Sequence, residues 1–131
     1  MGLKWSDLAK PWQVCFEEAL AGYQAGSFPI GAAVFDSNGN LLARGRNHIY
    51  DDHTAPGQIS LNQLAHAELN TLLQIDRRSH DLHTSVLYTS LEPCPLCMGA
   101  IYMSGIRKVF YGARDSFAGS TDLLGTTPYL T

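Results

Sequence analysis

The stretch SVLYTSLEPCPLCMGAIYMSGIRKVFYG, residues 85–112, decides the fold that we predict for this chain. Ser85 to Ser90 is short, apolar and rich in β-forming residues, and predicts a strand. Pro95 to Ser104 predicts a helix, because proline is favoured in a first helical turn, and Gly105 ends it. Val109-Phe110-Tyr111 then predicts the next strand. A strand, a helix and a strand with short connections are expected to form a right-handed βαβ crossover with parallel strands.

The rest of the chain adds a helix, a hairpin and a second helix before this unit. Pro11 to about Ala25 has apolar residues at helical spacing, and a glycine follows it. Ile30 to Phe35 and Leu41 to Arg46 flank a run of turn residues and predict an antiparallel hairpin. Leu61 to Ile75 again has helical spacing. The order α, β, β, α, β, α, β predicts an α/β protein with three layers, α/β/α, and a mixed sheet that begins with the hairpin.

Apolar spacing also predicts which helix faces are buried. The inward residues of the first helix are expected to be Trp12, Cys15, Phe16, Ala19, Leu20 and Tyr23, and those of the second are expected to be Leu64, Ala67, Leu69 and Leu72 or Leu73. His66 and Glu68 would then fall in the early turns of the second helix. The polar segment from His48 to about Gln58 is expected to be a surface loop.

Composition limits the classes of protein to consider. The 131 residues are 45% hydrophobic and 16% charged, which predicts one globular domain over residues 1–131. No secretory signal or apolar run long enough to span a membrane is present, and three cysteines do not form a disulfide framework. We therefore expect a cytoplasmic protein that does not contact membranes. A net charge of -3 argues against a broad nucleic-acid surface.

Two cysteines and one histidine form a candidate metal site. Cys94 and Cys97 would lie around the first turn of a helix, where the helix dipole favours thiolates. Together with His66 they make a zinc ligand set of three, which leaves the fourth tetrahedral position to water, as in catalytic sites. The alternative is a closed structural site, and its fourth ligand would come from Cys15, His48, His53, His80 or His83.

Glu68 gives this site a reaction. It lies two residues from the candidate ligand His66, close enough to take a proton from a zinc-bound water and return it to a departing amine. Attack of zinc-bound hydroxide on an amine-bearing ring carbon would release ammonia and leave a carbonyl. The motifs His66-Ala67-Glu68 and Pro93-Cys94-Pro95-Leu96-Cys97 together match the H-x-E and P-C-x-x-C signature of zinc nucleobase deaminases.

With these motifs the chain resembles the cytidine deaminase superfamily, in the branch that holds tRNA adenosine deaminases, guanine deaminases and fungal-type cytosine deaminases. Phe28 to Ala32, Ala43 to Asn47 and Leu87 to Glu92 are similar to segments of that branch. The resemblance implies a cytidine deaminase-like fold, one Zn²⁺ per chain and a homodimer. It also implies that Asn47 contacts the base and that the backbone around Ala67 lines the pocket.

For Asn47 and for two aromatic residues, the sequence itself also suggests a role, apart from the resemblance. Asn47 stands at a strand end, where asparagine often makes only a local turn hydrogen bond. Phe28 and Phe117 flank glycine-containing loops rather than lying in strands, so we expect them, among the aromatic residues, to offer a stacking wall for a base.

The substrate remains open between two classes. Tyr111 to Asp115 and the residues after it resemble tRNA adenosine deaminases, which favours an adenosine in RNA. Against this, the stretch His48 to Ala65, which should border the pocket mouth, is longer than in that branch, and Thr131 comes before the C-terminal helical region of those enzymes. With few basic residues, a free base or nucleoside is favoured, and tRNA is the alternative. A third hypothesis is a non-catalytic, zinc-stabilised binding module.

Overall fold

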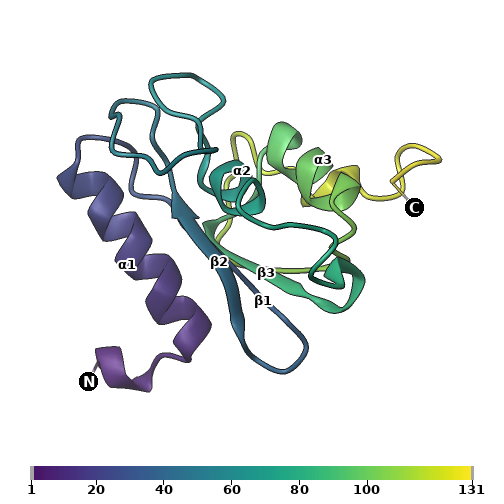
Figure 1. The fold of residues 1–131 in the computed structure, drawn as a ribbon, viewed down its shortest axis with the longest axis horizontal. Coiled ribbons are helices and arrows are strands. Elements are labelled where there is room, and N and C mark those ends of the chain that lie inside the picture. Colours follow the sequence, from purple (N-terminus) through teal and green to yellow (C-terminus); the bar gives the residue numbers. More distant parts are fainter. Residues whose placement is uncertain (1, 131) are drawn as a thin grey trace.

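The computed structural model describes residues 2–130 and confirms the predicted order of helices and strands (Figure 1). The main elements are α1 (Lys10–Gln24), β1 (Gly31–Phe35), β2 (Leu41–Arg46), α2 (Ala67–Leu72), β3 (Val86–Leu91), α3 (Pro95–Met103) and β4 (Lys108–Ala113). Three short 3₁₀ turns, η1 (Trp5–Asp7), η2 (Leu82–Thr84) and η3 (Thr121–Leu123), complete the described chain. None of the helices within residues 2–130 is long and apolar enough to cross a membrane.

The four strands form one mixed sheet in the order β2-β1-β3-β4. Strand β1 pairs antiparallel with β2 and with β3, whereas β3 and β4 are parallel, as expected for strands joined through a helix. The hairpin turn between β1 and β2 is stabilised by Asp36, whose Oδ1 accepts the N–H groups of Asn38 at 2.9 Å and Asn40 at 2.8 Å. The predicted mixed sheet with an initial hairpin is confirmed.

Helices cover both faces of this sheet (Figure 1). Alternate residues of a strand point to opposite faces. Ala33 and Phe35 of β1 therefore pack with Val14 and Cys15 of α1, whereas Val34 lies in a second cluster. The other members of the second cluster include Leu87, Ile101 and Ile106, with Leu42, Leu72, Ile75, Leu82 and Val109 packed against them. The predicted α/β/α arrangement is confirmed.

Helix α1 approaches the sheet through small residues. A Cβ atom added to Gly31 of β1 would overlap the Cys15 carbonyl oxygen and lie 2.7 Å from the Ala19 nitrogen. The buried residues of α1 are Val14, Cys15, Ala19 and Gly22, and Phe16, Leu20 and Tyr23 are exposed. The prediction that these three large side chains point inward was therefore wrong. The helix packs on the sheet through its smaller residues, because only these let the two backbones approach so closely.

The second helix is much shorter than predicted. It covers Ala67–Leu72 rather than Leu61 to Ile75, and Leu64 and Leu73 are each 50% exposed. Leu61 has a φ of 52°, and the Asn62 Oδ1 accepts the Leu64 N–H at 2.8 Å, so this segment forms turns instead of a helix. Apolar spacing alone could not reveal this local competition. His66 consequently lies at the N-cap of α2, not within an early turn.

Candidate metal and catalytic site

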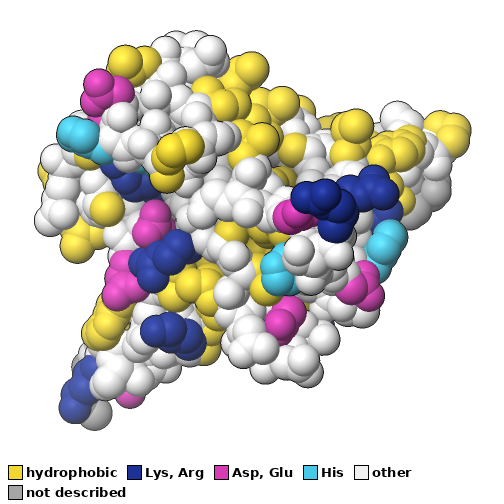
Figure 2. All heavy atoms as spheres, viewed as in Figure 1, with side chains coloured by type: hydrophobic (Ala, Val, Ile, Leu, Met, Phe, Trp, Pro, Cys, Tyr) yellow, Lys and Arg dark blue, Asp and Glu magenta, His cyan; other side chains and the backbone are white. Residues whose placement is uncertain are grey.

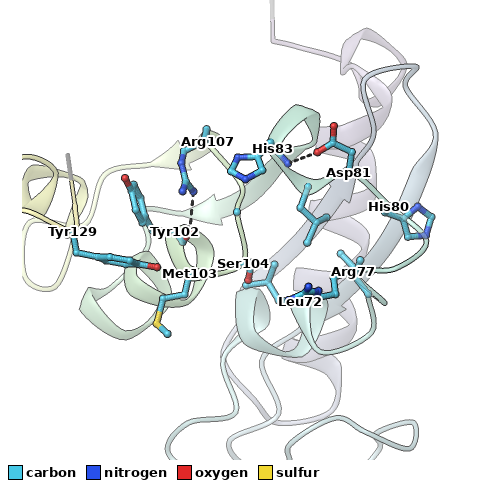
Figure 3. A pocket seen from close by; sticks show the side chains of 13 residues that line it. Leu72, Arg77, His80, Asp81, His83, Tyr102, Met103, Ser104, Arg107 and Tyr129 are labelled. Atoms are coloured by element: carbon cyan, nitrogen blue, oxygen red, sulfur yellow. Dashed lines mark hydrogen bonds between the residues drawn. The ribbon is translucent and has the colours of Figure 1, made fainter.

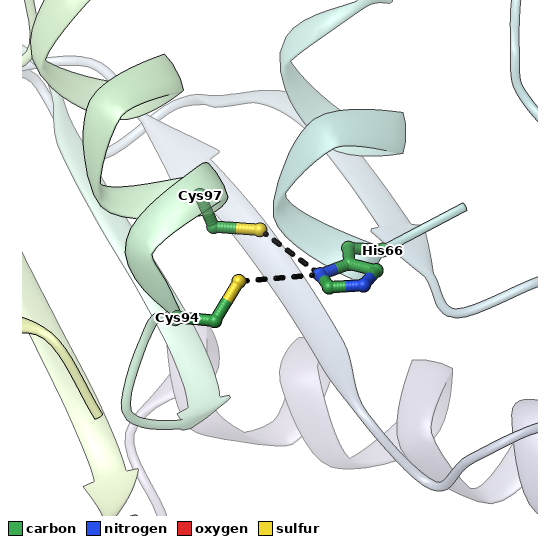
Figure 4. Close-up of side chains that lie close together, drawn as sticks. All are labelled: His66, Cys94 and Cys97. Atoms are coloured by element: carbon green, nitrogen blue, oxygen red, sulfur yellow. Dashed lines mark hydrogen bonds between the residues drawn. The ribbon is translucent and has the colours of Figure 1, made fainter. Parts of the chain in front are cut away.

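The N-termini of α2 and α3 bring the three predicted metal ligands together (Figure 4). Cys94 is the N-cap residue of α3, Pro95 follows it in the first turn, and Cys97 lies within the same turn. His66 Nδ1 lies 3.4 Å from Cys94 Sγ and 3.4 Å from Cys97 Sγ. All three ligand atoms lie within 4.8 Å of one another.

This geometry fits zinc. Zn–S bonds of about 2.3 Å and Zn–N bonds of about 2.0 Å, at tetrahedral angles, separate sulfur from nitrogen by about 3.5 Å. The observed separations of 3.4 Å match that value. Two sulfurs and one imidazole are also a ligand set that zinc favours.

The described part of the chain offers no fourth ligand of the usual kind. No other His, Cys, Asp or Glu side chain of residues 2–130 lies within 4.8 Å of all three ligand atoms. Cys15 is fully buried in the core between α1 and the sheet, and His48 Nδ1 lies 3.2 Å from Asp51 Oδ2. Within residues 2–130 the arrangement therefore fits the open, three-ligand site better than the closed structural alternative.

The two thiols differ in acidity. The Cys97 thiol and the His66 ring both donate toward Cys94, which lowers the pKa of Cys94 to about 4. The same hydrogen bond to Cys94, together with burial, raises the pKa of Cys97. Deprotonation of the pair therefore gives a thiolate that the other thiol and the His66 ring stabilise, and a thiolate is the form that binds metal.

Glu68 lies beside this cluster as a buried carboxylate. It is the second residue of α2 and only 4% exposed. Burial raises its pKa to about 7, because the loss of hydration outweighs the opposing charge interaction with His66. A carboxyl group with this pKa both accepts and donates a proton near neutral pH.

A cavity of about 370 Å³ opens onto the candidate site. His66, Glu68 and Cys94 line it, so the predicted ligands and the predicted proton carrier face one space. The other lining residues are Phe28, Ile30, Asn47, Ile49, Ala67, Leu91, Glu92, Asp115, Phe117 and Ala118. Its walls are mainly apolar, with a few polar groups, which is typical of small-molecule sites.

The residues named from the sequence as substrate contacts all line this cavity. Asn47 is buried, and its Oδ1 accepts the Ile49 N–H at 2.9 Å, so the local turn bond is present. Its Nδ2 has no hydrogen bond within residues 2–130 and is available to a ligand. Phe28 is 47% exposed and Phe117 97% exposed, so both aromatic faces are accessible. Of the loop His48 to Ala65, only Ile49 reaches the cavity.

Sequence reasoning missed the role of Glu92. Its carboxylate accepts hydrogen bonds from the Asp115 N–H at 3.2 Å and from Thr121 Oγ1 at 2.7 Å and the Thr121 N–H at 3.3 Å. These bonds fix the segment that carries Phe117 across the cavity. The signal available in the sequence was a carboxylate directly before the Pro93-Cys94 motif.

A second hollow of about 620 Å³ lies at the opposite ends of α2 and α3 (Figure 3). Arg77, Arg107, His80 and His83 line it, and none of the predicted metal ligands does. Arg107 donates to the Tyr102 carbonyl at 2.9 Å and stacks on the Tyr102 ring. A cation at this position donates hydrogen bonds to the last carbonyl groups of α3 and so stabilises the end of the helix. The presence of Arg107 in this hollow is therefore explained by its structural role.

Comparison with known proteins identifies the family. The model of the cytidine and deoxycytidylate deaminase zinc-binding region matches residues 6–113. The chain belongs to this family. Its fold and the His66, Cys94 and Cys97 cluster agree with a zinc-binding deaminase domain.

Relatives of this deaminase-family chain act on different substrates. A cytosine deaminase from Candida albicans is 30% identical over 119 residues, which cover 90% of this chain and 74% of the relative. A solved structure from a study of A-to-I editing by tRNA:A34 deaminases has a TM-score of 0.75 at 27% identity and covers 92% of this chain and 90% of that one. Guanine deaminase from Bacillus subtilis has a TM-score of 0.65 at 30% identity, covering 82% and 66%. The chain spans only 60% to 63% of three other curated deaminases.

Proposed function

We propose that this deaminase-family chain is a zinc-dependent hydrolase that converts the amine-bearing ring carbon of a nucleobase or nucleoside to a carbonyl and releases ammonia. His66, Cys94 and Cys97 hold one zinc ion, and Glu68 moves the protons. The observation that carries the proposal is the buried Glu68 carboxylate, which lines the same cavity as His66 and Cys94.

The reaction needs a nucleophile and a proton carrier. Zinc, when bound, lowers the pKa of a coordinated water toward neutrality and so supplies the nucleophile. Glu68 accepts a proton from the attacking water at its carboxylate and returns it to the departing amino group, which leaves as ammonia. The pKa of Glu68, about 7, suits both transfers, because the group is poised between its two protonation states.

The remaining residues orient the ring. Asn47 Nδ2 donates to an acceptor on the ring edge, and the N–H of Ala67, in the first turn of α2, offers a second donor. Phe28 stacks on the face of the base. The apolar walls around these groups lower the local dielectric, which strengthens each hydrogen bond.

The cavity and the charge favour a small substrate. A volume of about 370 Å³ admits a base or a nucleoside. The chain carries a net charge of -3, and Figure 2 shows Lys and Arg side chains in separate small groups among acidic ones. The second candidate is an adenosine in tRNA, which the similarity to a tRNA:A34 deaminase over 90% of that chain favours.

We further propose that residues 1–131 act as a single deaminase domain and that the protein is a cytoplasmic homodimer. Met103 and Leu96 of α3 are exposed by 74% and 39%, and burial of these apolar side chains against a second copy would stabilise a dimer. Size-exclusion chromatography with light scattering gives the mass that decides this point.

The first test is a panel of substrates. The zinc-loaded protein is incubated with cytosine, guanine, adenine and their nucleosides, and ammonia release is measured. Turnover of one compound supports the small-molecule function. No release from a folded protein that carries one zinc excludes these substrates, and a tRNA substrate is then assayed for inosine. A chain that is inactive on both would be a binding module.

A further inference from the structure

A buried ion pair lies directly behind the candidate substrate pocket. Arg46, the last residue of β2, donates from two guanidinium nitrogens to the two carboxylate oxygens of Asp51, both at 2.9 Å. The two side chains are only 9% and 5% exposed. This bidentate geometry is specific in direction as well as strong.

Asp51 is the meeting point of two segments of the chain. Besides Arg46, its carboxylate accepts hydrogen bonds from Ser27 Oγ at 2.5 Å and from the His53 N–H at 3.1 Å. Ser27 Oγ in turn accepts the Tyr50 N–H at 3.1 Å. Segment 27–30, before β1, is therefore tied to segment 47–53, after β2.

These two segments supply neighbouring parts of the pocket wall. Phe28 and Ile30 come from the first segment, and Asn47 and Ile49 come from the second. Arg46 also donates to the Asn47 carbonyl at 3.0 Å, so the same guanidinium holds the backbone of the proposed base contact. The Asn47 N–H also donates to the Ile30 carbonyl at 3.1 Å, so the two segments lie side by side as one wall. The ion pair and Ser27 add a second connection between them.

The connection extends to the metal site. The His48 N–H, within segment 47–53, donates to the Ala65 carbonyl at 2.9 Å. Ala65 is the residue before the candidate ligand His66. The pocket wall and the entry to α2 are thus built on the same buried network.

Stability alone is a poor reason for such a pair. Desolvation of two charges commonly cancels their attraction, and well-packed apolar residues of similar size often serve the fold as well or better. An apolar pair, however, forms no hydrogen bonds and therefore cannot hold two loops in one relative orientation. We propose that the Arg46–Asp51 pair is a positioning device that fixes the shape of this pocket wall, with Phe28 and Asn47 in it, and so the size of base that binds; this role rests on the proposed deaminase function.

Three variants separate positioning from stability. In Arg46→Met/Asp51→Leu both charges are replaced by apolar side chains, so that no buried charge remains unpaired. Ser27→Ala leaves the ion pair intact and removes the two hydrogen bonds of the Ser27 hydroxyl, to Asp51 and from the Tyr50 N–H. Arg44→Met is the matched control, because Arg44 lies on the same strand and pairs with Glu17 and Glu18 away from the pocket. Thermal unfolding establishes that each variant is folded.

Two measurements follow on the zinc-loaded protein. Amide hydrogen exchange of residues 27–30 and 47–53 should become about tenfold faster in the double variant, and Ser27→Ala should show this in residues 27–30. For the base that the wild type deaminates, the double variant should raise KM about tenfold with kcat within about twofold, as expected when binding geometry is loosened. Its preference between a pyrimidine and a purine should fall, and Arg44→Met should change none of these values.

The proposal is overturned if the folded double variant and Ser27→Ala both keep wild-type exchange in these segments. It is equally overturned if exchange rises but KM and the preference between pyrimidine and purine stay unchanged, since the network would then be structural only. If the wild type releases no ammonia from any base, the proposed function fails separately. The exchange comparison by itself then supports or overturns the link between the ion pair and the two segments of this wall.

Discussion

Glu68 shows how one residue acquires a chemical role from its surroundings. An exposed glutamate is a carboxylate at neutral pH, but burial at the start of α2 raises the pKa of Glu68 to about 7. We predict that Glu68→Gln keeps the fold and the zinc and loses activity by about 10²- to 10⁴-fold, the usual contribution of a general acid and base. Ammonia release, with zinc content as the control, measures this. A variant that deaminates at the wild-type rate would exclude Glu68 as the proton carrier.

Asp51 should make stability depend on pH in a defined direction. The Arg46 guanidinium and the Ser27 hydroxyl hold the pKa of Asp51 well below its usual range. Stability from a lowered carboxyl pKa is fully present above the unfolded value of about 4 and is lost as pH falls toward the folded value. We therefore predict that Asp51→Asn is less stable than the wild type at pH 6, and that the difference shrinks below about pH 4. Thermal unfolding of both proteins across this range is the measurement, and a difference that grows in acid would contradict it.

At the scale of elements, the candidate metal site joins the N-termini of two helices. His66 comes from α2, and Cys94 and Cys97 come from α3. Zinc that binds only the folded arrangement stabilises it by about 2.7 kcal/mol when free zinc is about 100 times its Kd. We predict that Cys97→Ser loses zinc and unfolds at a lower temperature, and that a chelator lowers the unfolding temperature of the wild type but not of this variant. A full equivalent of zinc in purified Cys97→Ser would argue against the ligand set.

The packing of α1 on the sheet gives a second prediction for elements. Gly31→Ala would push a methyl group into the backbone of α1 at Cys15 and Ala19, and should cost about 1–3 kcal/mol, as overpacking does. Gly99, inside α3, has open space where its Cβ would be. Gly99→Ala should therefore be neutral or stabilising by up to about 1 kcal/mol. Urea unfolding of the two variants compares them directly, and equal effects would show that the close approach of α1 is not limiting.

At the scale of the whole molecule, the charge distribution predicts weak binding to RNA. Of the basic residues, Arg44, Arg46 and Arg78 are paired with carboxylates within the described chain. The 12 acidic residues also outnumber the 9 basic ones, so the chain as a whole carries a charge that repels a phosphate backbone. We predict no retention on immobilised tRNA at about 150 mM salt. Retention that falls steeply with salt would instead favour the tRNA substrate.

The sequence predicted most of the fold because its signals were local. The hairpin, the first helix and the strand–helix–strand unit each carry turn residues or caps at their ends, such as Asp36, Gly26 and Pro95. The second helix was overpredicted, because apolar spacing continued through Leu61 to Ile75 although Asn62 and the left-handed Leu61 form turns there. The spacing of apolar residues cannot distinguish a buried helix face from a series of turns in which the same leucines are exposed to solvent.

By itself the sequence determined which groups are candidates for the chemistry of the site: His66, Cys94 and Cys97 as metal ligands and the adjacent Glu68 as proton carrier, because residue type and close spacing decide which groups can bind metal or move protons. Only the tertiary structure decided what surrounds them. The burial that raises the pKa of Glu68, the bonds from Glu92 to Asp115 and Thr121, and the Arg46–Asp51 pair behind the pocket arise from contacts between distant segments. The local dielectric constant and the shape of the pocket wall both depend on side-chain packing. That packing is decided only when the sheet and its two helix layers come together around the site.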